Sequence, residues 1–424
     1  MRISHLKSKI IVPVQQKFGG RALWSILDQA LVSGVNLLTG ILLVRTLGLR
    51  DFGNYALITV VAQSIAVLQL AAVISPLMTL FEQRGPISRG SYLTAVGMQQ
   101  LAYLIIITFC IIVTWSLVPD ALTNASIGVY AAISFFTSSQ LQEFSRRILF
   151  ASGRTRLAFL CDLIAYGGRL TILSYLAFQT ILDIETTWWT IASLNVTSFL
   201  LIVPDLARSK PIWAEVISIS RRHIELARWL FGTAASQWLS GNLLLILIGS
   251  ILGVEALGTV RAIQNLIGPI NLIVQSLENF MPSAASQILA TSPPAGLRRY
   301  INGSAIIGTS IFAVGILLSM PLLPYIVDLL YRRQFPSQEV VWLALGLYAT
   351  SGFVAAVFMA GLRALGELKT TFLFQLASGI VCLPIGWLAA TYFGLSGAMS
   401  VYLGQRMLTA VQIAIVFIKK TRLQ

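Results

Sequence analysis

Long apolar stretches, separated by short polar connections, run through the whole chain and limit it to one class of fold. A helix needs about 20 apolar residues to cross the hydrocarbon core of a bilayer, and each stretch is long enough. Because that core offers the backbone no water, segments of this length must form helices. The sequence therefore predicts an all-α integral membrane protein with about 12 transmembrane helices. The stretches lie at residues 21–45, 53–81, 92–119, 121–150, 158–180, 186–207, 229–253, 257–289, 301–331, 338–365, 370–393 and 395–418.

The composition agrees with a membrane protein and excludes a nucleic-acid-binding one. Hydrophobic residues make up 56% of the 424 residues and charged residues only 11%, whereas soluble domains have about 25% charged residues. The net charge of +14 is spread over the connections and forms no basic domain. The 3 cysteines lie in apolar stretches without paired spacing, so we expect neither a disulfide nor a metal site.

The positive charges predict the orientation of the chain. Lysine and arginine are concentrated in the N-terminal leader, in every second connection and in the C-terminal tail. The alternate connections hold only Arg45, Arg50, Arg332 and Arg333. Since cytoplasmic loops carry the excess of positive charge, both termini are expected in the cytoplasm.

Two short motifs occur twice. Residues 47–57 read LGLRDFGNYAL and residues 252–262 read LGVEALGTVRA; residues 151–160 read ASGRTRLAFL and residues 364–373 read ALGELKTTFL. The first pair follows the first span of each half, where its glycines would permit a tight reversal. The second pair follows the fourth span of each half.

These repeats divide the chain into two six-helix lobes, residues 1–207 and 229–424. An even number of spans gives both lobes the same orientation, so they form a parallel repeat about a pseudo-two-fold axis along the membrane normal. The connection 208–228 is expected to be a cytoplasmic linker. Its apolar spacing also allows a short amphipathic helix on the membrane surface.

The run LLTGILLVRTLGLRDFGNYAL, the SGRTR turn and the Pro282-containing ENFMPSAAS resemble bacterial polysaccharide (O-antigen) flippases. That family belongs to the superfamily of the multidrug and toxin extrusion (MATE) transporters and the lipid II flippases. The resemblance implies a MATE-like fold in the cytoplasmic (inner) membrane, whose lobes alternate between inward-open and outward-open states. A central, cationic cavity would bind the diphosphate and sugars of an undecaprenyl-linked oligosaccharide, for lipopolysaccharide or exopolysaccharide biosynthesis. Membrane lipids and the polysaccharide polymerase or export machinery are the expected partners, and no oligomer is required.

Two other functions stay open. A MATE-type, cation-coupled drug or small-molecule exporter is the nearer alternative. A membrane glycosyltransferase or polymerase is the more distant one, because the isolated His5 and His223 and the short outer loops offer no clustered catalytic groups. No glycine-rich nucleotide loop with a lysine is present either. We therefore expect a transporter that is not an enzyme and has no cofactor.

Arg169, Arg261 and Arg406 are assigned to the membrane interior and not to a connection, and a charge there costs about 3 kcal/mol on insertion scales. Arg261, in the eighth span, is the preferred phosphate ligand, because a guanidinium forms paired hydrogen bonds to phosphate oxygens. An arginine that reaches the outer membrane surface is the alternative. Arg169 and Arg406 lie on helices that are peripheral in the resembling family, and we expect structural contacts for them.

Polar residues on the first span form one stripe. Gln29, Ser33 and Asn36 recur at helical spacing beside Asp28, which predicts a wet cavity wall. Asp28 is a candidate for a coupling proton or Na⁺, because burial favours the neutral form of a carboxyl group. The alternative is a structural ion pair with an arginine. Glu278 in the eighth span is the other buried acid.

The remaining candidates would bind sugar hydroxyls or anchor the protein at the interface. The amide side chains of the eighth and second spans are assigned to the cavity wall: Gln264, Asn265, Asn271 and Gln63. Trp115, Trp188 and Trp189 are expected as anchors at the membrane–water interface.

Overall fold

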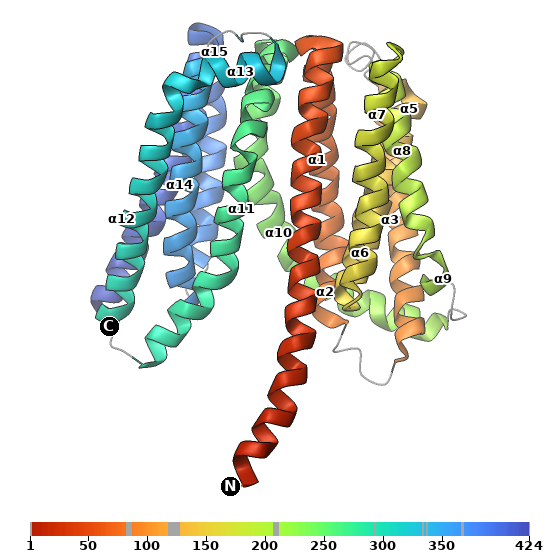
Figure 1. Ribbon diagram of the computed structural model, residues 1–424, viewed down its shortest axis with the longest axis vertical. Helices are drawn as coiled ribbons and strands as arrows, with labels where there is room; N and C mark the ends of the chain where they lie inside the picture. The colour runs from red at the N-terminus through yellow and green to blue at the C-terminus, as the bar shows by residue number, and fades with distance from the viewer. Residues whose placement is uncertain are drawn as a thin grey trace. The chain divides into compact units, whose positions relative to one another are not determined.

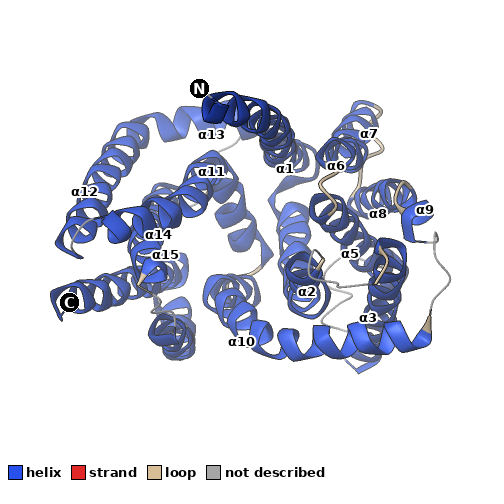
Figure 2. Cartoon of the chain, turned by 90° about the horizontal axis from the view of Figure 1, so that it is seen from below, coloured by secondary structure: helices blue, strands red, loops and turns tan. Residues whose placement is uncertain are grey.

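The computed structural model describes residues 2–81, 87–117, 128–206, 212–291, 294–332, 335, 338–365 and 369–423. This part of the chain is helical and contains no strand, which confirms the all-α prediction (Figures 1 and 2). The first half contains α1 (Arg2–Gln69), the π-helical η1 (Leu70–Ile74), α2 (Ser75–Leu80), α3 (Arg89–Leu117), α5 (Val129–Ala151), α6 (Thr155–Asp162), the π-helical η2 (Leu163–Gly167), α7 (Gly168–Phe178), α8 (Ile184–Leu200) and α9 (Val203–Leu206). The second half contains α10 (Trp213–Ile251), α11 (Val254–Thr291), α12 (Pro294–Ser319), the 3-10 helix η3 (Met320–Leu322), α13 (Leu323–Tyr331), α14 (Gln338–Ala364) and α15 (Lys369–Leu423).

Six helical segments of the described residues are long and apolar enough to cross a membrane. Two of them, Leu23–Leu80 with 58 residues and Ala377–Arg422 with 46, are longer than one span needs. Each is interrupted by a glycine with non-helical angles, Gly48 and Gly394. These glycines fall between predicted spans, so the apolar pattern separated the helices correctly. Where the structure describes them, the other predicted stretches also coincide with helices.

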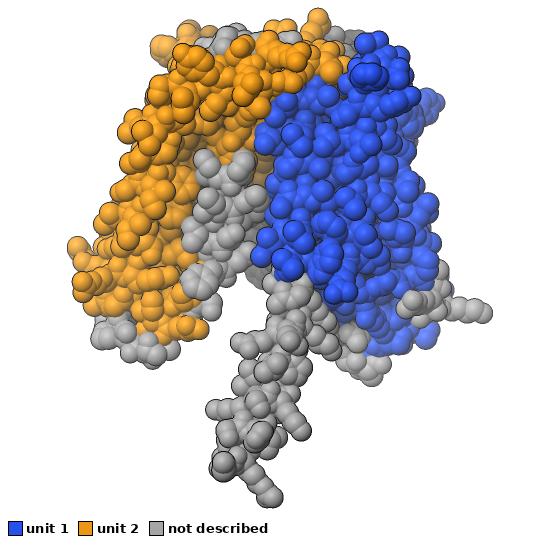
Figure 3. All heavy atoms as spheres, in the orientation of Figure 1, with its two compact units in different colours: residues 1–42, 61–234 blue, residues 43–60, 235–424 orange. Residues whose placement is uncertain are grey.

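The chain forms two compact units, shown in different colours in Figure 3. Unit 1 contains residues 1–42 and 61–234, and unit 2 contains residues 43–60 and 235–424. In unit 1, α5 packs against α3, α6 and α8. In unit 2, α14 packs against α11, α12 and α15. The apolar window of α14 is 67% buried and that of α12 only 11%, so α14 forms the centre of its unit and α12 its exterior.

The repeated Leu-Gly motif gives both copies the same backbone turn. The first glycine of each copy, Gly48 or Gly253, has φ 88°, a conformation that residues with a side chain rarely adopt. This confirms the predicted tight reversal. The second glycines allow the two copies to pack against each other within unit 2. A Cβ atom on Gly53 would lie 1.9 Å from the Val254 carbonyl oxygen, and one on Gly258 would lie 2.7 Å from that of Leu49.

The described part of the predicted linker is helical and continues into the seventh span as α10. Val216 and Ile219 are buried in the core of unit 1. The Tyr92 hydroxyl lies 2.9 Å from Nε2 of His223. Burial, with a smaller contribution from the nearby Arg222 charge, lowers the pKa of His223 to about 4. His223 is therefore neutral at physiological pH, and the first turns of α10 are held against α3.

The role of exposed anchor predicted for Trp188 is wrong. Trp188 is fully buried, and its ring centroid lies 4.5 Å from that of Phe135. The reason is that α8 packs against α5, and Trp188 lies on the face of α8 that meets Phe135 of α5. Its neighbour Trp189 remains 44% exposed.

We expect Gly53→Ala to lower the free energy of unfolding by about 2–4 kcal/mol, because the new methyl group would displace backbone. Gly34→Ala is the matched control: its Cβ would meet nothing within 4 Å, and alanine favours the helix by up to about 1 kcal/mol. Thermal denaturation of the purified protein compares the two variants. Equal melting temperatures would contradict the close packing of the two turns.

Candidate functional site

Helices α1, α5 and α6 of unit 1 bring one arginine between two buried carboxylates. Arg146 Nη2 lies 2.7 Å from Oδ2 of Asp28, and Arg146 Nε lies 2.9 Å from Oδ2 of Asp162. Both aspartates are fully buried. A buried charge is tolerated only when it is paired and hydrogen-bonded, so these contacts explain how two acids persist within predicted spans.

Neighbouring side chains extend this arrangement. Arg147 Nε lies 2.6 Å from Oε1 of Glu143, which is also 4.0 Å from Arg146 through its other oxygen. Gln142 donates a hydrogen bond to Asp162. We call Asp28, Glu143, Arg146, Arg147 and Asp162 the unit 1 charge cluster. With every group ionised, its three carboxylates outnumber its two guanidinium groups by one charge.

A second arrangement lies in unit 2 around Arg261 of α11. Its Nη1 donates to Oε1 of Gln264 at 3.1 Å. Its Nε and Nη2 atoms are buried and have no hydrogen-bond partner among the described residues. Arg261 thus holds a buried positive charge whose donors are only partly satisfied by the protein.

Two tyrosines and a second arginine lie in the same unit. Tyr348 of α14 and Tyr402 of α15 stack with ring centroids 4.3 Å apart and an interplanar angle of 4°. The Arg406 guanidinium lies 5.4 Å from the Tyr348 ring centroid, and its buried Nε has no partner in the described part of the chain. Arg261 and Arg406 both lie within electrostatic range of Tyr402. We call Arg261, Gln264, Tyr348, Tyr402 and Arg406 the unit 2 arginine–tyrosine cluster.

The close approach of Arg406 depends on a glycine. A Cβ atom on Gly352 of α14 would lie 3.0 Å from Nη2 of Arg406. Gly352 therefore leaves the space in which the guanidinium lies beside α14. The sequence suggested only a structural contact for Arg406 and did not predict its association with the Tyr348–Tyr402 pair.

The other predicted site residues are dispersed. Gln29 accepts a hydrogen bond from Arg146 at 3.3 Å, whereas Asn36 and Gln63 are exposed and Asn265 is half-buried. Arg169 lies 4.7 Å from the ring centroid of Tyr166 in its own span. The side chains of Asn271 and Glu278 lie outside the described residues.

Sequence reasoning missed Arg146. The sequence pattern places Arg146 among the basic residues of a cytoplasmic connection. Its partner Asp28 lies 118 residues away in the chain, so no local pattern connects the two. A local signal was present: Gln142, Glu143 and Arg146 recur at the three- and four-residue spacing of one helix face. That pattern ends six residues before the SGRTR turn, and it indicates a polar face of the helix and not a loop.

Comparisons with known proteins agree on the fold. No protein-family model and no curated protein sequence matches the chain. An inward-facing multidrug resistance MATE family transporter of the MOP superfamily matches with a TM-score of 0.72 and 14% identity, over 93% of this chain and 94% of that one. The lipid II flippase MurJ, in an inward closed conformation, matches with a TM-score of 0.70 and 12% identity, over 93% and 87%.

The chain has the MATE-like fold. A MOP superfamily transporter from Pyrococcus furiosus, described as having a binding pocket of reversed polarity, matches with a TM-score of 0.54 and 14% identity, over 97% of this chain and 93% of that one. Together with the apolar helices, these similarities support a multi-pass membrane protein. They confirm the predicted architecture, and at this level of identity they leave the substrate to be argued from the residues.

We predict that Arg146→Ala lowers the free energy of unfolding by roughly 3–5 kcal/mol, because two buried carboxylates lose their partner. Combining it with Asp28→Asn and Asp162→Asn should recover much of this loss, since no buried charge would then remain unpaired. Arg147→Ala, whose side chain is 37% exposed, is the control and should cost less than about 1 kcal/mol. Thermal denaturation in detergent compares the stability of these three variants. Equal losses for Arg146→Ala and Arg147→Ala would contradict the role of the cluster.

Proposed function

We propose that this protein is a flippase that moves an undecaprenyl-diphosphate-linked oligosaccharide across the bacterial cytoplasmic membrane by alternating access. The observation that carries the proposal is the buried Arg261 guanidinium, with two nitrogen atoms that no described residue satisfies. The fold that the chain shares with transporters, one of them a lipid II flippase, supports it.

Electrostatics favours an anion at the unit 2 arginine–tyrosine cluster. An arginine inside a bilayer is costly unless its charge and its donors find partners. The oxygens of a diphosphate would supply both, through the paired hydrogen bonds that suit a planar guanidinium. Arg406 adds a second positive charge near Tyr402. The Gln264 amide and the tyrosine rings are groups of the kind that contact sugars.

The same cluster argues against a cationic drug as substrate. It contains two arginines and no carboxylate, so a cation would be repelled. The fold alone does not decide, because a multidrug MATE transporter and a lipid II flippase match almost equally well. A MATE-type exporter therefore remains the alternative. A glycosyltransferase or polymerase receives no support, since the structural neighbours named above are transporters.

Coupling to an ion is assigned to the unit 1 charge cluster. Its excess of one carboxylate can be neutralised by a proton or by Na⁺, and a buried site favours such neutralisation. Binding or release of the cation would change how strongly Arg146 holds Asp28 and Asp162. This role extends the coupling expected for Asp28, and it includes Arg146 in the coupling site.

The proposal includes an environment and partners. We place the protein in the inner membrane with both termini in the cytoplasm, on the positive-inside rule. The polysaccharide polymerase or export machinery would take up the flipped oligosaccharide to build a surface polysaccharide. Membrane lipids would surround the exposed apolar helices, and no resident cofactor is needed.

Arg261→Ala should reduce flipping of an undecaprenyl-diphosphate-linked sugar in proteoliposomes by about 10- to 100-fold, the effect of losing a charged hydrogen bond of about 1.5–3 kcal/mol. Arg261→Lys keeps the charge without the planar fork and should fall between that variant and the wild type. Arg221→Ala, an exposed arginine on α10, is the control. Unchanged flux in Arg261→Ala would remove it as a phosphate ligand. Export of cationic dyes in place of lipid flipping would favour the drug exporter.

Asp28→Asn should flatten the dependence of transport on proton and Na⁺ gradients, because the amide cannot exchange a proton or contribute a charge. Asp162→Asn should have the same effect if the two carboxylates act together. Asp183→Asn is the matched control, since Asp183 caps α8 at an exposed position and asparagine caps equally well. Flux measured at a series of imposed gradients makes the comparison. A gradient response identical to the wild type would rule out Asp28 as the coupling residue.

A further inference from the structure

A cavity of about 560 Å³ lies in unit 2, between the first turns of α12 and the end of α15. Its polar lining comes from Arg298, Arg299, Asn302 and Thr421, and Ile306 lies at its apolar side. The volume falls in the range of small-molecule sites. None of these residues belongs to the arginine–tyrosine cluster. The positive-inside rule places this cavity, the α12–α15 pocket, at the cytoplasmic membrane surface.

Within the described residues, no carboxylate balances the positive charge of the α12–α15 pocket. Neither Arg298 nor Arg299 forms an ion pair with a carboxylate of the described residues. The Asn302 amide oxygen is buried without a hydrogen-bond partner in the same part of the chain. The start of α12 adds the positive end of a helix dipole. The two arginines and the helix start therefore give the pocket the electrostatics of an anion site, and the Asn302 oxygen leaves a free acceptor for a hydrogen-bond donor on the ligand.

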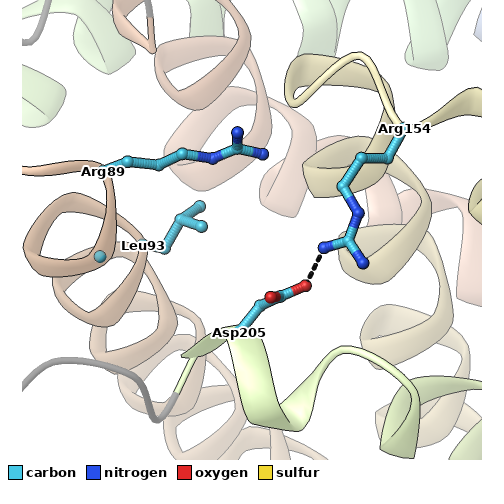
Figure 4. Close-up of a pocket in the computed structure, with 5 residues that line it drawn as sticks. Arg89, Leu93, Arg154 and Asp205 are labelled. Atoms are coloured by element: carbon cyan, nitrogen blue, oxygen red, sulfur yellow. Dashed lines mark hydrogen bonds and ion pairs between the residues drawn. The ribbon is translucent and has the colours of Figure 1, made fainter.

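Unit 1 has a corresponding pocket that is neutralised from within. It has a volume of about 250 Å³ and lies at the first turn of α3. Helix α3 is the third predicted span of the first lobe, and α12 is the third predicted span of the second lobe. Arg89 and Arg154 line it, and Arg154 forms an ion pair with Asp205, as Figure 4 shows. Asp205 is only 6% exposed. The repeat thus places a basic pocket in both halves, and among the described lining residues only those of the unit 1 pocket include a carboxylate.

The surroundings of the α12–α15 pocket are apolar on the side of the predicted bilayer. Ile306, Ile307, Ile311 and Leu318 of α12 are each more than 60% exposed, at 67%, 65%, 66% and 68%. Lys419 and Arg422, on either side of Thr421, are exposed on α15. Basic residues at the cytoplasmic end of a span, next to an apolar helix face, suit an anionic lipid whose acyl chains lie along that face.

We propose that the α12–α15 pocket binds a phosphate ester, with Arg298 and Arg299 holding the phosphate and Asn302 accepting a hydrogen bond from the group esterified to it. The exposed isoleucines favour the headgroup of an anionic phospholipid over a soluble phosphate compound. The bound lipid would supply the negative charge that Asp205 supplies in unit 1. This site is separate from the proposed transport site.

Native mass spectrometry of the purified full-length protein tests the proposal. Phosphatidylglycerol and phosphatidylcholine are titrated against the wild type and against Arg298→Ala/Arg299→Ala. We expect the wild type to retain phosphatidylglycerol preferentially and the double variant to bind it about 10-fold more weakly. Arg221→Ala/Arg222→Ala, which removes an adjacent exposed pair of arginines from α10, is the control and should bind as the wild type does. Equal binding by the wild type and the Arg298→Ala/Arg299→Ala variant would overturn the proposal.

Two further experiments identify the source of the phosphate and keep the test valid if the double variant does not fold. Glycerol 1-phosphate that displaces the lipid at comparable concentration would support the phosphate site and assign it to a soluble compound. Failure to compete would support the lipid. If the double variant does not fold, Arg299→Gln, at an exposed position, should weaken phosphatidylglycerol binding several-fold. Wild-type affinity in Arg299→Gln, with Arg298→Gln also unaffected, would overturn the assignment.

Discussion

A charge inside a bilayer must find a partner, and this constraint accounts for most of what the polar side chains of this protein do. Hydrocarbon solvates neither backbone nor ions, so the backbone forms helices and the charges form clusters. In unit 1, Arg146 satisfies Asp28 and Asp162 directly. In unit 2, Arg261 has a single amide partner and two unsatisfied donors among the described residues. In unit 1 the arginine is paired with carboxylates, whereas in unit 2 the described residues offer Arg261 no carboxylate.

The same contrast appears wherever the two halves can be compared. The repeated turn keeps its glycines, because φ 88° at Gly48 and Gly253 and the contact at Gly53 are conditions of the fold. Its second copy carries Arg261 where the first copy carries the buried Ala56. The basic pockets differ in the same way, since among their described lining residues only those of the unit 1 pocket include an aspartate. The backbone turn is the same in both copies, and the two halves differ in their charges.

The sequence predicted features that depend on local physics. Apolar length located the helices, and the glycines at 48 and 394 mark boundaries that the hydropathy pattern already implied. Contacts between residues far apart in the chain could not be predicted from the sequence. Arg146 is taken for a cytoplasmic charge until α1 and α5 bring it to Asp28. Trp188 is taken for an interfacial anchor until α8 packs against Phe135 of α5. The stacked Tyr348 and Tyr402 come from different helices, and no spacing in the sequence connects them.

The central claim is that unit 2 presents its arginines to the diphosphate of a lipid carrier. The most direct measurement compares undecaprenyl diphosphate with undecaprenol, the same lipid without charge, for binding to the purified protein by native mass spectrometry. The account predicts preferential retention of the diphosphate, and loss of that preference when Arg261 and Arg406 are both replaced by glutamine while Arg298 and Arg299 are kept. Equal retention of the two lipids by the wild type, or a preference that survives the replacement, would contradict it.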